Sequence, residues 1–587
     1  MAITLSELPN EVIYQILLSI PPTSVPTLQK VSRQFNDLAQ PILWRHHCQT
    51  LYRYWSPEHR MRENFNGPVA KIDWKNIFAE RHGVDRITST AIDSILASQV
   101  SRIEKTERII GHNYDAKDTL LRQLNVEDDA EDVLARRFYS DAVLGTLHRT
   151  MAIKEWVKLK DGEPVPLERA LAAFDMFVLH GRRGDFDEVS AQLDQLAEGV
   201  LTEDPEFVDQ PPRRQAIAVA EYLREHNMVG ISRAATDYHD LQNNFIGIAL
   251  QDDDHPSLPL ITVAIYCCVA KRLGLDAQPC GFPFHVQAII KPAAGHDLEG
   301  HAVEPGKETL PMYMDPFRSS LETDVKDLVA QLHALGVKPS AHAELLSASP
   351  VEEIVRRSAK NIITSVQTLP RLDGGRPISS PLSFPETESA FYGALWALIL
   401  LPDGNRLQAG VQRARYLHFL VERLEKQTLM DVGLMEEQIL PLIEDASQYR
   451  GLLDTIRVIR TADRKPKEVK DRSSETRKSV QYKVGQIFHH KRYYYTAVIT
   501  GWDVECAAGA DWMTHMNVHA LSRGQHQSFY HVLVEDGTVR YVAEENILIV
   551  QEEVGAELMA MAGQHFKRWD HTSKIFISNI KDEYPDD

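Results

Sequence analysis

The sequence predicts a multidomain α+β protein: a helical N-terminal module, a mainly helical middle with an α+β core, and a small C-terminal β domain. Three observations lead to this prediction. The chain has 587 residues, more than one hydrophobic core supports. Apolar residues recur every three or four positions through most of the first three quarters, as in amphipathic helices. Beyond a charged segment near residue 470 the apolar period becomes two, which indicates strands.

Composition narrows the class of protein. Hydrophobic residues make up 43% and charged residues 25%, as in ordinary globular chains. The five cysteines are scattered and odd in number, which favours free thiols in a reducing compartment. We expect no signal peptide, and the longest apolar run, residues 391–401, is too short for a membrane span and predicts a buried helix. A formal charge of −19 opposes non-specific binding to nucleic acid or membranes, so we expect a cytoplasmic or nuclear protein.

Residues 1–50 are predicted to form a helical docking module. Their apolar positions follow helical spacing in two stretches that a Pro-Pro pair separates. So short a stretch cannot bury all of these side chains internally, so some face a partner; the alternative is a bundle that packs on the rest of the chain. In type, order and spacing the following residues resemble the F-box motif: Leu8, Pro9, Asn10, Glu11, Ile16, Leu17, Leu28, Val31, Ser32, Phe35, Leu38, Leu43 and Trp44.

The F-box resemblance implies a partner. F-box modules bind a Skp adaptor, which links them to a cullin–RING scaffold. By this resemblance, the residues in or near the Skp interface are Leu8, Pro9, Ile16, Leu17 and Val31.

Residues 51–166 are predicted to be a helical connecting region. We expect breaks near Gly83 and at residues 163–166, where two prolines occur. Two helices are expected in residues 167–201, around the glycines at 181 and 184.

Residues 167–460 are predicted to form the α+β core with flanking helices. Four short motifs occur in order: Ser-Leu-Pro-Leu-Ile-Thr at 257–262, Val-Ala-Lys-Arg-Leu-Gly-Leu at 269–275, Gly-Phe-Pro-Phe-His at 281–285 and Asp-Pro-Phe at 315–317. Together they resemble the transglutaminase-like family of the bacterial SirB type. Catalytic members of that family use a cysteine at the start of the central helix, followed by a histidine and an aspartate.

The resemblance leaves the catalytic triad incomplete. The expected cysteine position falls at or next to Pro259, which suits a first helical turn but supplies no nucleophile. His285 and Asp315 stand where the base and its carboxylate belong, and we expect them to keep a hydrogen bond that orders the cleft. The interpretation is therefore a scaffold that binds peptide or protein.

Other thiols are considered as substitutes. Cys267 and Cys268 lie about 12–14 Å further along the helix at 1.5 Å per residue, so we expect them to be core residues. Cys280, five residues before His285, is the remaining candidate, if Gly281 and Pro283 fold the segment back. This leaves open an alternative function, a thiol hydrolase or transferase that uses Cys280, His285 and Asp315.

Residues 461–480 are predicted to be a charged linker, solvated and mobile. Residues 481–553 follow as a β domain, in which an Asp-Gly pair between residues 529–534 and 539–542 indicates a hairpin. An ordered set of residues from Val484 to Asn546 resembles the hemimethylated-DNA-binding-like (heat-shock protein Q) domain, which implies a small barrel. Residues 554–587 are predicted to be a tail.

The charge of the β domain opposes DNA binding. Residues 483–550 hold five Lys or Arg against seven Asp or Glu, whereas phosphate binding requires a basic excess. A DNA-binding regulator remains the second alternative function. We expect a protein-binding barrel instead, with an aromatic groove formed by Trp502, Trp512, Tyr530 and Tyr541.

No metal or cofactor is expected. The six histidines of the β domain match no common zinc spacing, and we expect them at the surface.

Taken together, the order of these parts resembles the F-box only proteins that end in a hemimethylated-DNA-binding-like domain. The resemblance implies a non-catalytic substrate-recognition adaptor of a Skp–cullin–F-box ubiquitin ligase, which directs a bound protein, its client, to degradation.

Overall fold

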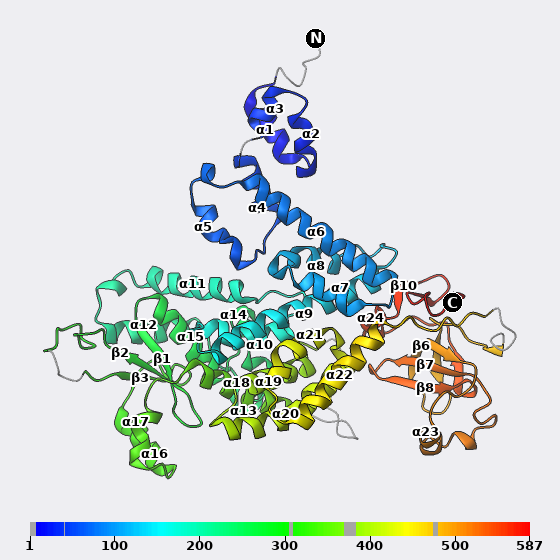
Figure 1. Ribbon diagram of the computed structural model, residues 1–587. Coiled ribbons are helices and arrows are strands. Elements are labelled where there is room, and N and C mark those ends of the chain that lie inside the picture. Colours follow the sequence, from blue (N-terminus) through cyan, green and yellow to red (C-terminus); the bar gives the residue numbers. More distant parts are fainter. Residues whose placement is uncertain (1–7, 40, 305–308, 369–382, 473–478) are drawn as a thin grey trace. The chain divides into compact units, whose positions relative to one another are not determined.

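The protein is described by a computed structural model that covers residues 8–39, 41–304, 309–368, 383–472 and 479–587 (Figure 1). These residues divide into two compact units, Met1–Leu147 with Arg460–Asp587, and His148–Ile459. The chain passes between the units within helices α9 (Val133–Lys160) and α22 (Ala446–Arg464). Within the described ranges, no helix has the length and apolar character that a membrane crossing requires.

The N-terminal part of the first unit is helical, as predicted. Ser32 starts α3 by accepting a hydrogen bond from the Phe35 N–H, and Asp73 does the same for α6 through the Asn76 N–H. One apolar core joins the first helices to the start of α6. The helices are α1 (Asn10–Ser19), α2 (Val25–Gln29), α3 (Arg33–Leu38), α4 (Pro41–Leu51), α5 (Met61–Asn66), α6 (Trp74–Ala97), α7 (Arg102–Ile110) and α8 (Lys117–Leu124).

One predicted break is wrong. Helix α6 runs through Gly83, where we expected an interruption. A mid-helix glycine costs only about 1 kcal/mol relative to alanine. The buried Trp74, Phe78 and Ile92 on the same helix outweigh that cost, because each buried large apolar side chain contributes roughly 1.5–3 kcal/mol.

The second unit surrounds a small sheet and the apolar helix α15 (Pro259–Arg272), which is buried along nearly its whole length. The predicted break at residues 163–166 and the two helices after it are confirmed, as α10 (Leu167–Val178) and α11 (Phe186–Glu203). The predicted buried helix is also confirmed, as α19 (Thr387–Leu400). The other helices are α12 (Pro212–Glu225), α13 (Ala234–Asp237), α14 (Ile246–Gln251), α16 (Val325–Ala334), α17 (His342–Leu345), α18 (Val351–Thr368), α20 (Arg406–Gln427) and α21 (Val432–Leu434).

The sheet of the second unit directly follows α15. It is antiparallel in sequence order, and its strands are β1 (Asp276–Cys280), β2 (Gln287–Lys291), β3 (Met312–Met314) and β4 (Glu322–Thr323). Side chains on one face of the sheet, those of Cys280, Ile289 and Tyr313, pack against Leu328 and Leu332 of α16. This order of helix and strands places His285 and Asp315 at neighbouring strand ends.

The C-terminal part of the first unit is a five-stranded antiparallel sheet with order β8-β7-β6-β5-β9. The predicted hairpin is confirmed as β7 and β8. The pairing is linear, with β8 and β9 at the edges, so closure into a barrel stays a prediction. Figure 1 shows β6, β7 and β8 side by side, near α23. The elements are β5 (Ile487–His490), β6 (Thr496–Asp503), α23 (Ala510–His515), β7 (Phe529–Val534), β8 (Val539–Ala543) and β9 (Ile547–Ile549).

Residues 554–587 are not a tail, which corrects our prediction. They form α24 (Ala556–Ala562) and a hairpin of β10 (Phe566–Asp570) and β11 (Ile575–Ser578). Phe566, Phe576 and Tyr584 are buried in the same core as the five-stranded sheet. The period-two pattern is hard to recognise here, because the strands are short and the register shifts between Phe566 and Arg568.

The predicted linker also differs from the structure. Helix α22 continues to Arg464, and the side chains of Lys470 and Arg472 pack against the β domain. Lys470 Nζ donates to Asp503 Oδ1 at 2.8 Å, and the Arg472 guanidinium lies 5.2 Å from the centre of the Trp502 ring. These charged side chains are partly buried because each has an acidic or aromatic partner, which composition alone does not reveal. Residues 473–478 of the predicted linker lie outside the described part of the chain.

Candidate functional site

The first three helices leave several apolar side chains uncovered. Ile13, Leu17 and Phe35 form the interior of this part, with exposed fractions of 7% or less. By contrast, Val12 is 43%, Val31 65% and Ile42 57% exposed. Ile42 lies near the start of α4. Residues 8–51 have four further exposed apolar residues, Pro9, Pro21, Pro41 and Leu51.

The five residues predicted for the Skp interface fall into three groups. Pro9 and Val31 are exposed, and Leu8 and Ile16 are partly exposed. Leu17 is 1% exposed and belongs to the interior, so it supports the module rather than offering a surface. Val12 and Ile42 were missed because burial, not residue type, distinguishes the two faces of these helices.

In the second unit, His285 and Asp315 form the predicted hydrogen bond, with 2.8 Å between His285 Nε2 and Asp315 Oδ2. The Asp315 side chain is buried, and it also accepts from the backbone N–H of Arg318 at 3.3 Å. Burial acts to raise the pKa of Asp315, but the hydrogen bond and charge of His285, with the nearby Arg318, lower it below its usual value. The pair therefore holds the segment just before β2 against the segment just after β3.

The residue at the start of α15 is Pro259, and the family resemblance predicts a nucleophile at or next to this position. Its N-cap residue, Leu258, provides no side-chain cap, so the first N–H groups of the helix have no side-chain acceptor there. Proline at N1 fits the helix because its missing N–H is one that the helix leaves unbonded.

The thiols of the second unit are core residues. Cys280 is fully buried on β1, among Phe282, Ile289 and Leu328, and its thiol donates to the carbonyl of Leu345 at 3.3 Å. Burial raises the pKa of Cys280 to about 11. Cys267 and Cys268 are also buried on α15, as predicted, and burial raises the pKa of both thiols. A thiol with so high a pKa is almost entirely protonated at neutral pH and is a weak nucleophile.

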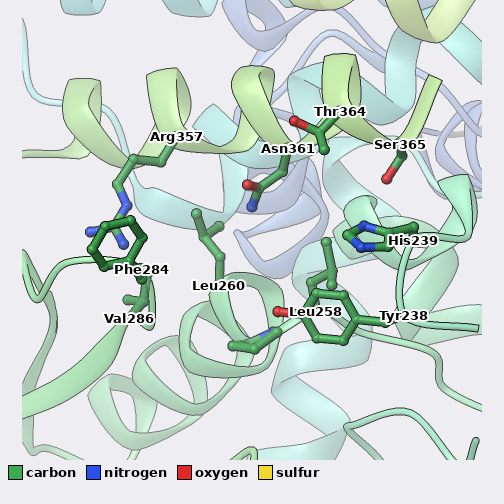
Figure 2. A pocket seen from close by; sticks show the side chains of 11 residues that line it. Tyr238, His239, Leu258, Leu260, Phe284, Val286, Arg357, Asn361, Thr364 and Ser365 are labelled. Atoms are coloured by element: carbon green, nitrogen blue, oxygen red, sulfur yellow. The ribbon is translucent and has the colours of Figure 1, made fainter. Parts of the chain in front are cut away.

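A cavity of about 100 Å³ lies at the start of α15. Figure 2 shows that α18 contributes Arg357 and Asn361 from one side, while Tyr238 and His239 come from the segment before α14 and Phe284 from the turn before β2. The Arg357 guanidinium donates to the carbonyl of Phe282 at 3.0 Å. Burial lowers the pKa of Arg357, against the opposing influence of Glu353 and Cys280.

These cavity residues were missed by the sequence prediction. They come from segments more than a hundred residues apart in the chain, and only the fold brings them together. Four of them lie in predicted motifs: Leu258, Pro259 and Leu260 in the motif at 257–262, and Phe284 in the motif at 281–285.

Only two of the four aromatic residues predicted to form a groove in the β domain are accessible at its surface. Trp502 and Tyr530 are 1% and 0% exposed and belong to the core, so neither is available to a client. Trp512 and Tyr541 are partly exposed, with ring centres 5.7 Å apart. The Tyr541 hydroxyl donates to Asp503 Oδ2 at 2.7 Å, which fixes its ring.

One of the six histidines is not at the surface, contrary to expectation. His490 is buried, and its Nδ1 accepts from the backbone N–H groups of Arg492 and Tyr493, each at 3.1 Å. Burial and the nearby Arg540 lower the pKa of His490. In the described segments, no group of three or more His, Cys, Asp or Glu is arranged to hold a metal ion.

Three family models match the sequence. An F-box-like model matches residues 5–50, a model of the transglutaminase-like superfamily matches residues 187–360, and a model described as hemimethylated DNA-binding protein YccV like matches residues 480–573. The last match extends beyond residue 553 and includes α24 and β10, in agreement with their place in the same core.

Similarity to known proteins extends over the whole chain. F-box only protein 21 of Pongo abelii, of Homo sapiens and of Mus musculus are each 24% identical to it, over 99% of this chain and 92% of theirs. No solved structure matches. The chain thus carries an F-box-like, a transglutaminase-like and a hemimethylated-DNA-binding-like domain in that order, and it is similar to F-box only protein 21 along its full length.

Proposed function

We propose that the chain is a substrate-recognition subunit of a Skp–cullin–F-box ubiquitin ligase and has no catalytic step of its own. The observation that carries the proposal is the F-box-like N-terminus, whose helices leave apolar side chains uncovered. The full-length similarity to F-box only proteins supports it. All five cysteines are free, which fits the reducing cytoplasm or nucleus in which we propose it acts.

The N-terminal helices support the Skp interface through their exposure. Isolated exposed apolar residues are common, but several within one short module suggest a protein interface. Pro9, Val12, Val31 and Ile42 supply that apolar area, and Leu8 and Ile16 are accessible in part. Leu17, Ile13 and Phe35 hold the helices that present them.

The rest of the chain then serves to bind a client. Catalysis in such a ligase is positional, because the adaptor raises the concentration of client lysines near a ubiquitin-loaded partner. Acid–base groups are therefore not required of this subunit. Pro259 at the start of α15 and the high pKa of Cys280 support a domain that retains a cleft without its nucleophile.

The test is a substitution on the exposed apolar residues. Val31→Asp places a charge where we propose that Skp binds, and because the side chain is 65% exposed the fold is unaffected. We expect binding to purified Skp adaptor to weaken at least tenfold, since desolvating an unpaired charge costs several kcal/mol. Val208→Asp, at a residue that is 74% exposed in the second unit, is the matched control and should bind normally. Equal affinity of the two variants refutes the proposed interface.

A further inference from the structure

The polar side chains that line the cavity at the start of α15 include a basic group and no acidic group. The cavity's side chains include Arg357, Asn361, Tyr238 and His239, and none of the residues that line it is Asp or Glu. A polar cavity without acids, beside a guanidinium, favours an anion.

Most N–H donors of the Arg357 guanidinium have no described hydrogen bond. A guanidinium offers five N–H donors, and its described hydrogen bond uses one of them, to the Phe282 carbonyl. In the described ranges no carboxylate lies within ion-pair distance of it, whereas its neighbour Arg356 pairs with Asp403 at 2.6 Å. A half-buried arginine of this kind is well suited to bind a planar carboxylate by two parallel hydrogen bonds.

The start of α15 also favours an anion in the cavity. Pro259 and Leu260 line the cavity, and the helix N-terminus there has no side-chain cap. The unbonded N–H groups and the helix dipole both favour negative charge. Asn361, which Figure 2 shows pointing from α18 toward Leu260, adds an amide donor.

Phe284 lies at the rim of the cavity in an unusual conformation. Its φ is +63°, and the His285 N–H bonds the Pro283 carbonyl at 2.7 Å, which closes a three-residue turn around it. The ring is nevertheless 88% exposed. Strained backbone is retained where surrounding structure imposes it, and it is concentrated at binding sites. The hydrogen bond between His285 and Asp315 fixes the last residue of this turn.

We propose that this cavity binds a carboxylate of the client, either the carboxyl end of its chain or an Asp or Glu side chain. Arg357 and Asn361 bind the carboxylate oxygens, and Phe284 packs against the residue before it. The volume, about 100 Å³, exceeds the roughly 10–15 Å³ that one water requires and is compatible with one carboxyl group. The inference rests on the proposed function only in taking the carboxylate to belong to a client.

The experiment uses the full chain, immobilised, and pools of random short peptides. One pool ends in a free carboxylate, a second in an amide, and a third ends in an amide and lacks Asp and Glu. Captured peptides are quantified by mass spectrometry. We expect at least one carboxylate-bearing pool to be captured about tenfold more than the third pool, from the loss of charge-assisted hydrogen bonds. Preference for the first pool identifies the chain end as the source, and equal capture of the first two identifies the acidic side chain.

Variants link the capture to the cavity. Asn361→Asp introduces a negative charge into it and should abolish the preference; Gln367→Glu makes the same change of charge on an exposed position of α18 and should not. Arg357→Met should also abolish it. Phe284→Ala removes a ring that supports no core and should weaken capture several-fold without unfolding. Equal capture of all pools, or a preference that survives Asn361→Asp and Arg357→Met, overturns the inference. Skp binding is measured on the same samples, so failure of the adaptor proposal is seen separately.

Discussion

Asp175, on α10, is a carboxyl group held in the interior of the second unit. It is 2% exposed, its Oδ1 accepts from the Ile248 N–H at 3.1 Å, and its Oδ2 is buried without a hydrogen-bond partner in the described structure. Burial raises the pKa of Asp175 to about 8, although backbone N–H groups at the start of α14 oppose the shift. A protonated Asp175 is thus favoured in the fold at neutral pH.

This carboxyl makes stability depend on pH. Because the pKa of Asp175 is higher in the folded than in the unfolded chain, the contribution of this group to stability is fully present below about pH 4 and is lost as pH rises through about 8. The loss is on the order of 5 kcal/mol at most. We predict that Asp175→Asn removes this dependence, so that the variant gains stability relative to the natural chain between about pH 5 and about pH 8.5. Urea unfolding at both values measures it, with the exposed Asp454→Asn as control; a gap that stays constant contradicts the burial argument.

The cysteines allow a direct test of the thiol-enzyme alternative. Cys48, Cys267, Cys268 and Cys280 are buried, and only Cys506 is partly exposed. With a pKa of about 11, roughly one Cys280 thiol in ten thousand is ionised at neutral pH. We predict that iodoacetamide modifies the folded chain at Cys506 alone, and that Cys506→Ser removes the label. Rapid modification of Cys280 that depends on His285 would instead favour catalysis, and mass spectrometry of the digested chain distinguishes the outcomes.

At the scale of elements, the sequence was most informative where one period or one strong turn dominated. The hairpin of β7 and β8, the break between α9 and α10, and the buried helix α19 all follow from local residues. Prediction failed where a distant partner decides the structure. Arg472 is ordered by Trp502 and by Asp587, whose Oδ1 accepts from its Nε at 2.7 Å, more than a hundred residues away. The charged composition near residue 470 does not predict those partners.

An ion pair joins two elements of the second unit that are distant in the sequence. Arg149 on α9 binds Asp431, just before α21, with Nε–Oδ2 and Nη2–Oδ1 distances of 2.7 and 2.8 Å. Asp431 is 0% exposed. We predict that Arg149→Met lowers the free energy of unfolding by about 3–5 kcal/mol, because it leaves a buried charge unpaired. The double variant Arg149→Met/Asp431→Met should lose less than the single one.

The control for this prediction is an exposed pair. Arg457 and Asp454 on α22 are 3.5 Å apart and largely exposed. Exposed pairs contribute about 0–1 kcal/mol, so Arg457→Met should have little effect. Similar losses at Arg149 and Arg457, measured by chemical denaturation, contradict the assignment of a buried pair.

For the whole molecule, the order of domains could be predicted because each domain has its own short motifs. The helical and β regions, and their sequence, follow from these motifs and from the change of period near residue 480. The candidate carboxylate site could not be predicted. Tyr238, Pro259, Phe284 and Arg357 lie in four separate segments of the chain, and no local pattern indicates that they share a cavity. The burial of Trp502 and Tyr530 could not be predicted from the sequence either, since aromatic residues occur in both cores and grooves.

The name of the family that matches the C-terminal domain suggests DNA as a ligand. Affinity for duplex DNA comes largely from Lys and Arg that neutralise phosphates, and it falls steeply with salt when many phosphates are contacted. This chain has a formal charge of −19, and residues 483–550 carry five basic against seven acidic side chains. One of the basic ones, Arg540, pairs with Asp536 at 2.8 Å, and another, Arg523, pairs with Glu544 at 2.9 Å. Few cations therefore remain for phosphates.

We predict no measurable binding of the full chain to hemimethylated or unmodified duplex DNA in fluorescence anisotropy at about 150 mM salt, and only weak binding at about 50 mM. A basic variant provides the positive control for the electrostatic argument. Replacing Glu505, Glu535 and Glu552, which are exposed, by lysine changes the charge of the β domain by six units and should produce salt-dependent binding. If the natural chain instead binds one form of DNA below micromolar concentration at about 150 mM salt, with a steep loss on adding salt, phosphate contacts exist that the charge distribution does not predict. The C-terminal domain would then recognise nucleic acid, and client binding would have to lie in the second unit.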